Sequence, residues 1–89
     1  MDNVMGEMAV QNKEPSRFNF GYAIYSMKHG KSVAREGWNG KGMFIALQTP
    51  TESSKMTLPY IYMSTVGGQF VPWLASQTDM LAEDWMIAD

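Results

Sequence analysis

The chain has 89 residues, a formal net charge of -2 and no cysteine, which excludes a disulfide framework and thiolate chemistry and suits a reducing cytoplasm. Its seven Lys and Arg residues are scattered, so DNA and RNA, which are bound by clustered cations, are not expected partners. The first residues lack the basic and apolar parts of a signal peptide, and no stretch approaches the roughly 18 apolar residues of a membrane span, so we expect a cytoplasmic protein without a membrane partner.

Two parts of the chain are expected to differ in order. Residues 1–17 show neither a helical nor a strand period and end in Pro15, Ser16 and Arg17, which predicts a mobile N-terminal lead-in. The periodic apolar patterns lie in residues 18–89, and this length predicts one domain.

A helix is expected over about residues 20–29. Apolar residues recur there at the i, i+3, i+4, i+7 spacing of one helix face, namely Phe20, Ala23, Ile24 and Met27. Asn19 is a suitable N-cap, and Gly30 is a suitable residue just past the C-terminus. Tyr22 and Tyr25 lie off this face, either as half-buried flanks or as residues that face a subunit or a ligand.

Two strand pairs are predicted next. Residues 31–35 alternate in polarity and residues 42–48 form a longer apolar run, with the hairpin signal Asn39-Gly40 between them. After a polar loop over residues 49–57, residues 60–65 and 69–74 flank a second hairpin signal, Gly67-Gly68. Pro72 cannot donate to a ladder, so its strand is expected at a sheet edge or a bulge.

The C-terminal part is predicted to contain a helical turn within residues 76–84, capped by Thr78 or Asp79, and a short strand over residues 85–88 that carries Trp85 into the core. The expected fold class is therefore α+β, with one short N-terminal helix packed on a small antiparallel β-sheet.

The composition favours a homo-oligomer. Only 18% of the residues are charged, against about 25% in typical soluble domains, and a domain of this size has a marginal core of its own. The nine Met residues and the aromatic content of 12% are typical of interface cores. Part of the apolar surface is thus expected to contact another copy of the chain.

Aromatic and polar residues suggest a binding site for a flat polar molecule. Trp38 and Trp73 each stand among polar residues, and an aromatic face stacks on a purine for about 1–3 kcal/mol. Asn, Gln and Asp side chains bind base edges or ribose hydroxyls, and Arg35 is suited to a pyrophosphate. Either tryptophan taken alone is equally compatible with a place in the core.

Catalytic and metal sites are not expected. His29, the single histidine, is interpreted as a solvated residue at a helix end. Among the carboxylates Asp79, Glu83 and Asp84, helix capping and surface solvation explain two more simply than acid–base chemistry. The glycines at 37, 40 and 42 have the wrong spacing for a phosphate-binding loop and are interpreted as turn glycines. No cofactor is implied.

Four blocks of the sequence resemble the Thoeris anti-defence two family of small phage and prophage proteins. The most specific are the block Arg35-Glu36-Gly37-Trp38-Asn39-Gly40 and the long block from Val71 to Trp85; residues 20–23 and 58–63 supply the other two. The resemblance covers roughly residues 18–87 and leaves residues 1–17 and the 48–57 loop outside it.

The resemblance implies a sponge for an immune signal. Members of that family bind a cyclic ADP-ribose-type signal of the host Thoeris system without cleaving it, some relatives hold cyclic oligonucleotides, and the family forms homotetramers with pockets at subunit boundaries. Residues 18–89 would then be a single ligand-binding domain. On this interpretation the adenine is held by aromatic rings, and phosphate and ribose by polar side chains. The aromatic set is Trp38, Trp73 and either Tyr22 or Phe18, and the polar set is Arg35, Asn39, Ser76, Gln77, Thr78 and Asp79.

Two alternatives stay open. A protein–protein interaction module would use the Met and aromatic surface on a host or phage protein. An enzyme that degrades the signal is the other alternative, although the sequence offers no triad, metal cluster or activated nucleophile.

Overall fold

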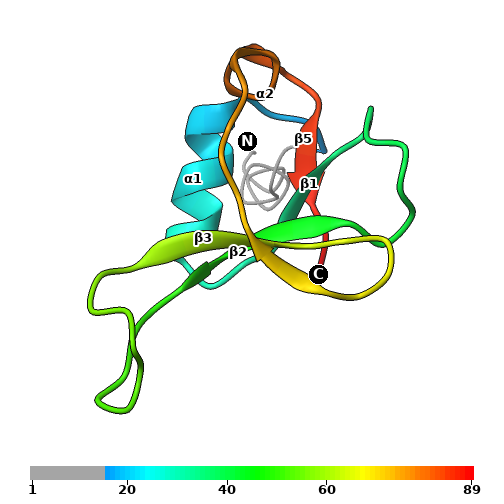
Figure 1. The fold of residues 1–89 in the computed structure, drawn as a ribbon. Coiled ribbons are helices and arrows are strands. Elements are labelled where there is room, and N and C mark those ends of the chain that lie inside the picture. The colour runs from blue at the N-terminus through cyan, green and yellow to red at the C-terminus, as the bar shows by residue number, and fades with distance from the viewer. Residues whose placement is uncertain (1–15) are drawn as a thin grey trace, which may run out of the picture.

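The computed structural model describes residues 16–89, so the predicted N-terminal lead-in lies outside the described residues except for Ser16 and Arg17. The chain forms helix α1 (Phe20–Lys28), strands β1 (Val33–Arg35), β2 (Phe44–Gln48), β3 (Tyr60–Ser64) and β4 (Phe70–Pro72), helix α2 (Gln77–Leu81) and strand β5 (Trp85–Ile87). The strands make one antiparallel sheet in the order β4-β3-β2-β1-β5 (Figure 1). The predicted α+β class is confirmed.

Helix α1 begins and ends where the sequence predicts, within one residue. The Asn19 side chain accepts a hydrogen bond from the Tyr22 amide at 2.9 Å, which satisfies a free donor of the first turn. Gly30 has a φ of 88°, in the left-handed region, and its amide donates to the Met27 carbonyl at 3.0 Å. These two local signals account for where the helix begins and ends.

The core lies between α1 and one face of the sheet. Val33, Ile45 and Trp85 are fully buried there, and Ala23 and Met27 meet them from the helix. The prediction that Trp85 belongs to the core is confirmed. Helix α1 packs against β5, β1 and β2 but makes no contact with β3 or β4, so the helix covers only half of the sheet.

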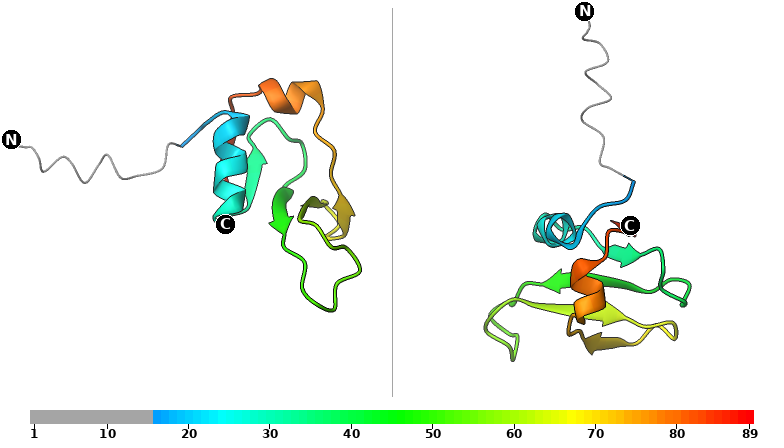
Figure 2. Two further views of the ribbon diagram at one scale, coloured as in Figure 1. Left: turned by 90° about the vertical axis from the view of Figure 1, so that its left-hand side faces the viewer. Right: turned by 90° about the horizontal axis from the view of Figure 1, so that it is seen from above.

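The connection between β2 and β3 projects away from α1, as both views of Figure 2 show. It holds residues 49–59, of which 49–57 are the predicted polar loop, and its Met56 and Leu58 are exposed. The second hairpin is confirmed, with Gly68 at a φ of 82° between β3 and β4. Pro72 lies on the edge strand β4, also as predicted.

The prediction of a tight hairpin turn at Asn39-Gly40 is wrong. Strands β1 and β2 do pair, through Val33 and Ile45, but a loop over residues 36–43 joins them, and its one positive φ is at Gly42. Tertiary contacts place this loop: Trp38 packs on Trp85, and Gly40 approaches Met43 and Val66 so closely that a side chain there would collide with both. Tertiary packing has outweighed the local turn preference.

The predicted cap of α2 also needs correction. Ser76, and not Thr78 or Asp79, is the N-cap, because Asp79 lies at the third position of the helix and completes a capping box with it. The Ser76 hydroxyl accepts from the Asp79 amide at 3.0 Å, and the Asp79 carboxylate accepts from the Ser76 amide at 3.2 Å. Each residue therefore satisfies the other's free donor.

Candidate functional site

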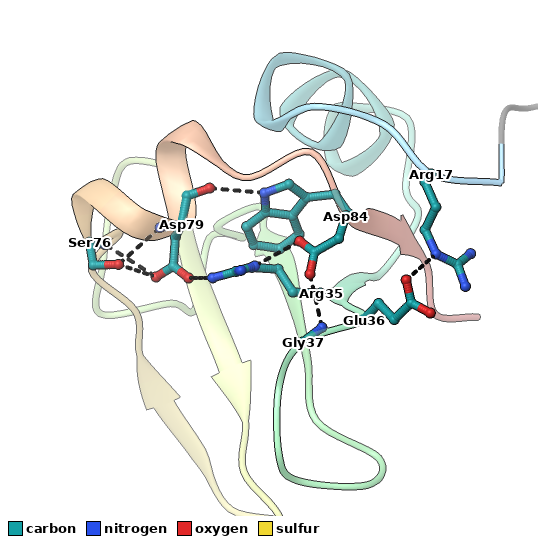
Figure 3. Close-up of polar contacts among 8 residues, drawn as sticks. Arg17, Arg35, Glu36, Gly37, Ser76, Asp79 and Asp84 are labelled. Carbon is teal, nitrogen blue, oxygen red and sulfur yellow. Dashed lines mark hydrogen bonds and ion pairs between the residues drawn. The ribbon is translucent and has the colours of Figure 1, made fainter.

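The end of β1 carries an ion-pair network that joins three separate parts of the chain. Arg35 donates through Nε to Oδ1 of Asp84 at 2.9 Å and through Nη1 to Oδ1 of Asp79 at 3.0 Å. Figure 3 shows Arg35 between the two carboxylates. The three side chains are 17%, 14% and 29% exposed for Arg35, Asp79 and Asp84, so the network is largely screened from water.

The same network fixes the start of the 36–43 loop. Oδ2 of Asp84 accepts from the Gly37 amide at 2.9 Å, and the backbone carbonyl of Asp84 accepts from the Glu36 amide at 3.0 Å. A side chain at Gly37 would come within 3.0 Å of that carboxylate, which explains a glycine at this position. Glu36 itself turns outward and pairs with Arg17 on the exposed surface at 2.9 Å.

Asp79 has three partners at once. Its Oδ2 accepts from the Ser76 hydroxyl at 2.9 Å, its Oδ1 accepts from Arg35, and its backbone carbonyl accepts from the Trp85 indole at 2.9 Å. Burial alone would raise the pKa of Asp79, but the hydrogen bonds from Ser76 and Arg35 outweigh it and lower the pKa. Asp79 is therefore ionised at neutral pH and committed to contacts within the protein.

Asp84 is held in the same state by a different balance. The hydrogen bond from Arg35 is the main cause that lowers the pKa of Asp84; burial opposes it and the Gly37 amide adds to it. A general acid at neutral pH needs a raised pKa, so neither carboxylate of the network suits that role.

Trp38 and Trp73 both rest on the fully buried Trp85. The Trp38 ring centroid lies 5.4 Å from that of Trp85 with planes at 79°, and the Trp73 centroid lies 6.2 Å away with planes at 87°. Trp73 also contacts Phe20, with centroids 6.1 Å apart. Both rings are half-buried, so each contributes to packing and keeps part of its surface in contact with solvent.

Three of the predicted polar residues are exposed. Asn39 lies in the 36–43 loop, and Gln77 and Thr78 form the first turn of α2. Within residues 16–89 none of the three side chains makes a hydrogen bond to the protein. They differ in this from Arg35, Ser76 and Asp79, whose polar atoms are engaged within the fold.

Phe18 and Tyr22 lie in a different hollow. Their ring centroids are 4.7 Å apart, Tyr22 continues to Tyr25 at 5.4 Å, and the hollow of about 720 Å³ is bounded on another side by Glu83. Phe18 is itself buried, bridged through its backbone to Trp85. The chain by itself thus does not bring the predicted aromatic set around one point.

A large groove beside β4 was not part of the predicted site. It has a volume of about 710 Å³, and one wall is Trp73. Its other lining residues come from the end of β2, the 56–62 segment and β4, and they include Leu58, Tyr60, Tyr62 and Phe70. The aromatic run at residues 60–62 was the available signal, but nothing in the sequence placed it beside Phe70.

Other candidate sites give no positive indication. Among residues 16–89, no three His, Cys, Asp or Glu side chains gather as they would around a metal ion, and no helix there is long and apolar enough to cross a membrane. The Nδ1 atom of His29 lies 2.9 Å from the Tyr25 carbonyl at the end of α1, which is a local capping contact.

Comparison with known proteins identifies the family to which the chain belongs. The Thoeris anti-defense 2-like domain matches residues 18–88. A protein of Bacillus phage SP01 described as Thoeris anti-defense 2 is 34% identical over an alignment 85 positions long, which covers 81% of this chain and 96% of that protein. The Arg35–Gly40 block and the Ser76–Trp85 block contact each other through Arg35, Asp79 and Asp84. The chain belongs to the Thoeris anti-defense 2-like family, a family of phage anti-defence proteins.

Proposed function

We propose that the protein binds a cyclic ADP-ribose-type immune signal and sequesters it without cleaving it, so that the effector of the host Thoeris system is not activated. The observation that carries this proposal is the pair of half-exposed rings, Trp38 and Trp73, that both pack on a buried tryptophan, in a chain whose Asn39, Gln77 and Thr78 are exposed. Family membership supports the anti-defence role itself.

The division of labour follows from which groups are uncommitted. Trp38 and Trp73 offer rigid aromatic surface to the adenine, and each stacked ring contributes about 1–3 kcal/mol. Asn39, Gln77 and Thr78 have donors and acceptors that no protein group in residues 16–89 uses, so they serve the ribose and the base edge. Phe18 and Tyr22 line another hollow; in this proposal the half-buried Tyr22 reaches a ligand from a neighbouring copy, and the buried Phe18 supports the Tyr22 ring.

Capture without turnover is favoured by the state of the polar groups. Asp79 and Asp84 have lowered pKa values, which makes them weak bases as well as unavailable acids at neutral pH. The Ser76 hydroxyl donates to Asp79, so the nearest base to this hydroxyl is a weak one that Arg35 also holds. The arrangement therefore gives no strong activation to a nucleophile.

A homotetramer is part of the proposal. The sheet register puts Ala46, Tyr62 and Pro72 on the face opposite the core, together with Phe44 and Phe70. No helix in residues 16–89 packs on β3 or β4, and Phe70 is 68% exposed. Another copy of the chain is the partner that we propose for this face, and light scattering at micromolar concentration tests it. A monomer mass would contradict it.

The decisive experiment is recovery of the ligand. The protein is incubated with a molar excess of cyclic ADP-ribose isomers, boiled, and the released nucleotide is quantified by mass spectrometry. Unchanged ligand in a fixed ratio to protomers supports sequestration. Progressive loss of the excess would reveal an enzyme.

Trp73→Ala tests the site. We expect it to reduce affinity by about 1–3 kcal/mol, because one stacking surface is lost. Leu74→Ala is the matched control, since Leu74 is the next residue and is 91% exposed. Calorimetry measures the loss of affinity, and a melting curve of the same variant measures the loss of stability. Wild-type affinity in a destabilised Trp73→Ala protein would mean that this ring has a purely structural role.

A second candidate function is a protein–protein interaction module. The groove beside β4 favours it, because Leu58 is 74% exposed and Phe70 68% exposed on its walls. The two functions differ in a simple measurement. At a hundred times its dissociation constant, a cyclic nucleotide adds about 2.7 kcal/mol of stability to a sponge and so raises its melting temperature. The melting temperature of an interaction module that does not bind the nucleotide stays the same.

A further inference from the structure

We infer that Arg35, Asp79 and Asp84 form a latch that positions the ligand-contacting segments, and that Arg35 is a positioning residue which does not itself contact the phosphates of the ligand. The latch is defined as these three side chains. The inference rests on the proposed sequestration of a nucleotide signal, because the 36–43 loop and α2 carry the side chains assigned there to base and ribose.

Arg35 is poorly suited to bind a phosphate directly. Two of its donors already bind carboxylates, at 2.9 and 3.0 Å, and its side chain is only 17% exposed. Two carboxylates beside one guanidinium leave negative charge in excess, which repels a pyrophosphate at short range. A phosphate would have to replace a charge-assisted hydrogen bond before it formed one of its own.

The latch is instead well placed to hold both ligand-contacting segments. Asp84 accepts from Arg35 with one oxygen and from the Gly37 amide with the other, and Trp38 and Asn39 follow directly in the chain. Asp79 accepts from Arg35 with one oxygen and from Ser76 with the other, which secures the turn that carries Gln77 and Thr78. One guanidinium thus links the loop that follows it directly to a helix whose Asp79 lies 44 residues further along the chain.

This link has a consequence for binding. A loop and a short helix that are already held in place lose little conformational freedom when the ligand arrives, so less of the interaction energy is spent on ordering them. Helix α2 has only five residues and no buried side chain, so its position depends on a few contacts: the latch, its capping box, the bond from the Trp85 indole to the Asp79 carbonyl, and packing on α1.

Asp84→Asn separates the two roles of Arg35, because they predict opposite signs. If Arg35 bound a ligand phosphate, removing the neighbouring negative charge would free the guanidinium and tighten binding. If the latch positions the loop, the amide nitrogen of Asn, which is a donor, faces the donor of either Gly37 or Arg35, and one of these hydrogen bonds is lost. The loop is then held less firmly, and affinity for cyclic ADP-ribose falls roughly tenfold. Asp79→Asn is the second variant, with the same expected direction.

Arg17→Gln is the matched control. It breaks another Arg–carboxylate pair, to Glu36, whose side chains are 43% and 59% exposed, and it is expected to leave the affinity unchanged. Calorimetry is done well below the melting temperature of each variant, so that a general loss of stability does not alter the dissociation constant. Tighter or unchanged binding in both Asn variants overturns the latch.

Hydrogen exchange supplies a measurement that needs no ligand. In Asp84→Asn the amides of residues 36–43 and 77–82 are expected to exchange faster than in Arg17→Gln, while those of α1 stay the same. Equal exchange in the two variants overturns the latch. Failure of the wild-type protein to bind cyclic ADP-ribose would instead refute the sequestration proposal, and the exchange result would still decide whether the latch holds the two segments.

Discussion

The two halves of the sheet differ in how far helix α1 covers them and buries their apolar side chains. In the half formed by β2, β1 and β5, helix α1 closes the core, and Val33, Ile45 and Trp85 have no exposed surface. In the half formed by β3 and β4, no described helix covers the strands, and Phe70 is 68% exposed. A chain of this size can close only one core by itself, and the other half presents apolar surface to a partner or a ligand.

The two halves also differ in the kind of site that they carry. The closed half carries the Arg35 latch, whose two carboxylates both accept hydrogen bonds from Arg35, and the open half carries the apolar groove beside β4. The proposed ligand site lies where the two halves meet, since Trp73 packs on Trp85 and also lines the groove. The comparison predicts large effects on stability from the closed half and small ones from the open half.

Trp85→Ala should have the largest effect. The ring is fully buried and contacts Phe20, Trp38 and Trp73, so its removal is expected to cost about 3–5 kcal/mol of unfolding free energy. Urea denaturation measures this loss. A change below about 1 kcal/mol would mean that the closed half is not the stable part of the fold.

Acid is expected to weaken the closed half next. The pKa values of Asp79 and Asp84 are lowered in the folded protein, so their contribution is fully present above the ordinary Asp value of 3.8 and is lost as the pH falls through the lowered values. The free energy of unfolding should be level between about pH 7 and 5 and fall below about pH 4. In the Asp79→Asn/Asp84→Asn variant the fall should be shallower; an equal fall would show that other carboxylates cause it.

Gly40→Ala tests the contact between the 36–43 loop and the β3–β4 turn. The added carbon collides with Met43 and Val66, and we expect a cost of about 1 kcal/mol, at the low end for overpacking because both side chains can shift. Gly67→Ala is the control, because a side chain there approaches nothing closer than Thr65 Oγ1 at 4.0 Å. Thermal denaturation compares the two, and equal melting temperatures would contradict the contact.

Phe70→Ser should have the smallest effect on the protomer, within about 0.5 kcal/mol in dilute denaturation experiments, because the ring is mostly exposed. Its expected effect is on assembly, as a lower mass in light scattering. An unchanged oligomer would show that β4 is not a subunit contact.

Parts of the fold could be predicted from the sequence because they depend on contacts between residues that are close together in the chain. Asn19 and Gly30 bound a helix through hydrogen bonds within four residues, and Gly67-Gly68 makes a turn between two strands that lie next to each other in the chain. The Ser76-to-Asp79 capping box is equally local, and a Ser followed three residues later by an acid was the signal that the predicted caps at Thr78 and Asp79 overlooked.

The candidate site was less predictable because its contacts are distant. The identities of Trp38, Trp73 and Arg35 suggested a ligand, but a sequence does not state which atoms a side chain has already used. Arg35 meets its two carboxylates 44 and 49 residues further along the chain. Whether a guanidinium is free for a phosphate depends on that meeting.

The sequence by itself determined the family, the α+β class, helix α1, the β3–β4 hairpin and the burial of Trp85. These depend on hydrogen bonds between neighbours and on apolar period, which are both properties of the linear chain. Only the tertiary structure decided that Arg35, Ser76 and Asp79 are engaged within the fold while Asn39, Gln77 and Thr78 are not. The physical reason is that a polar side chain takes its role from the charges and donors that folding brings within about 3 Å of it.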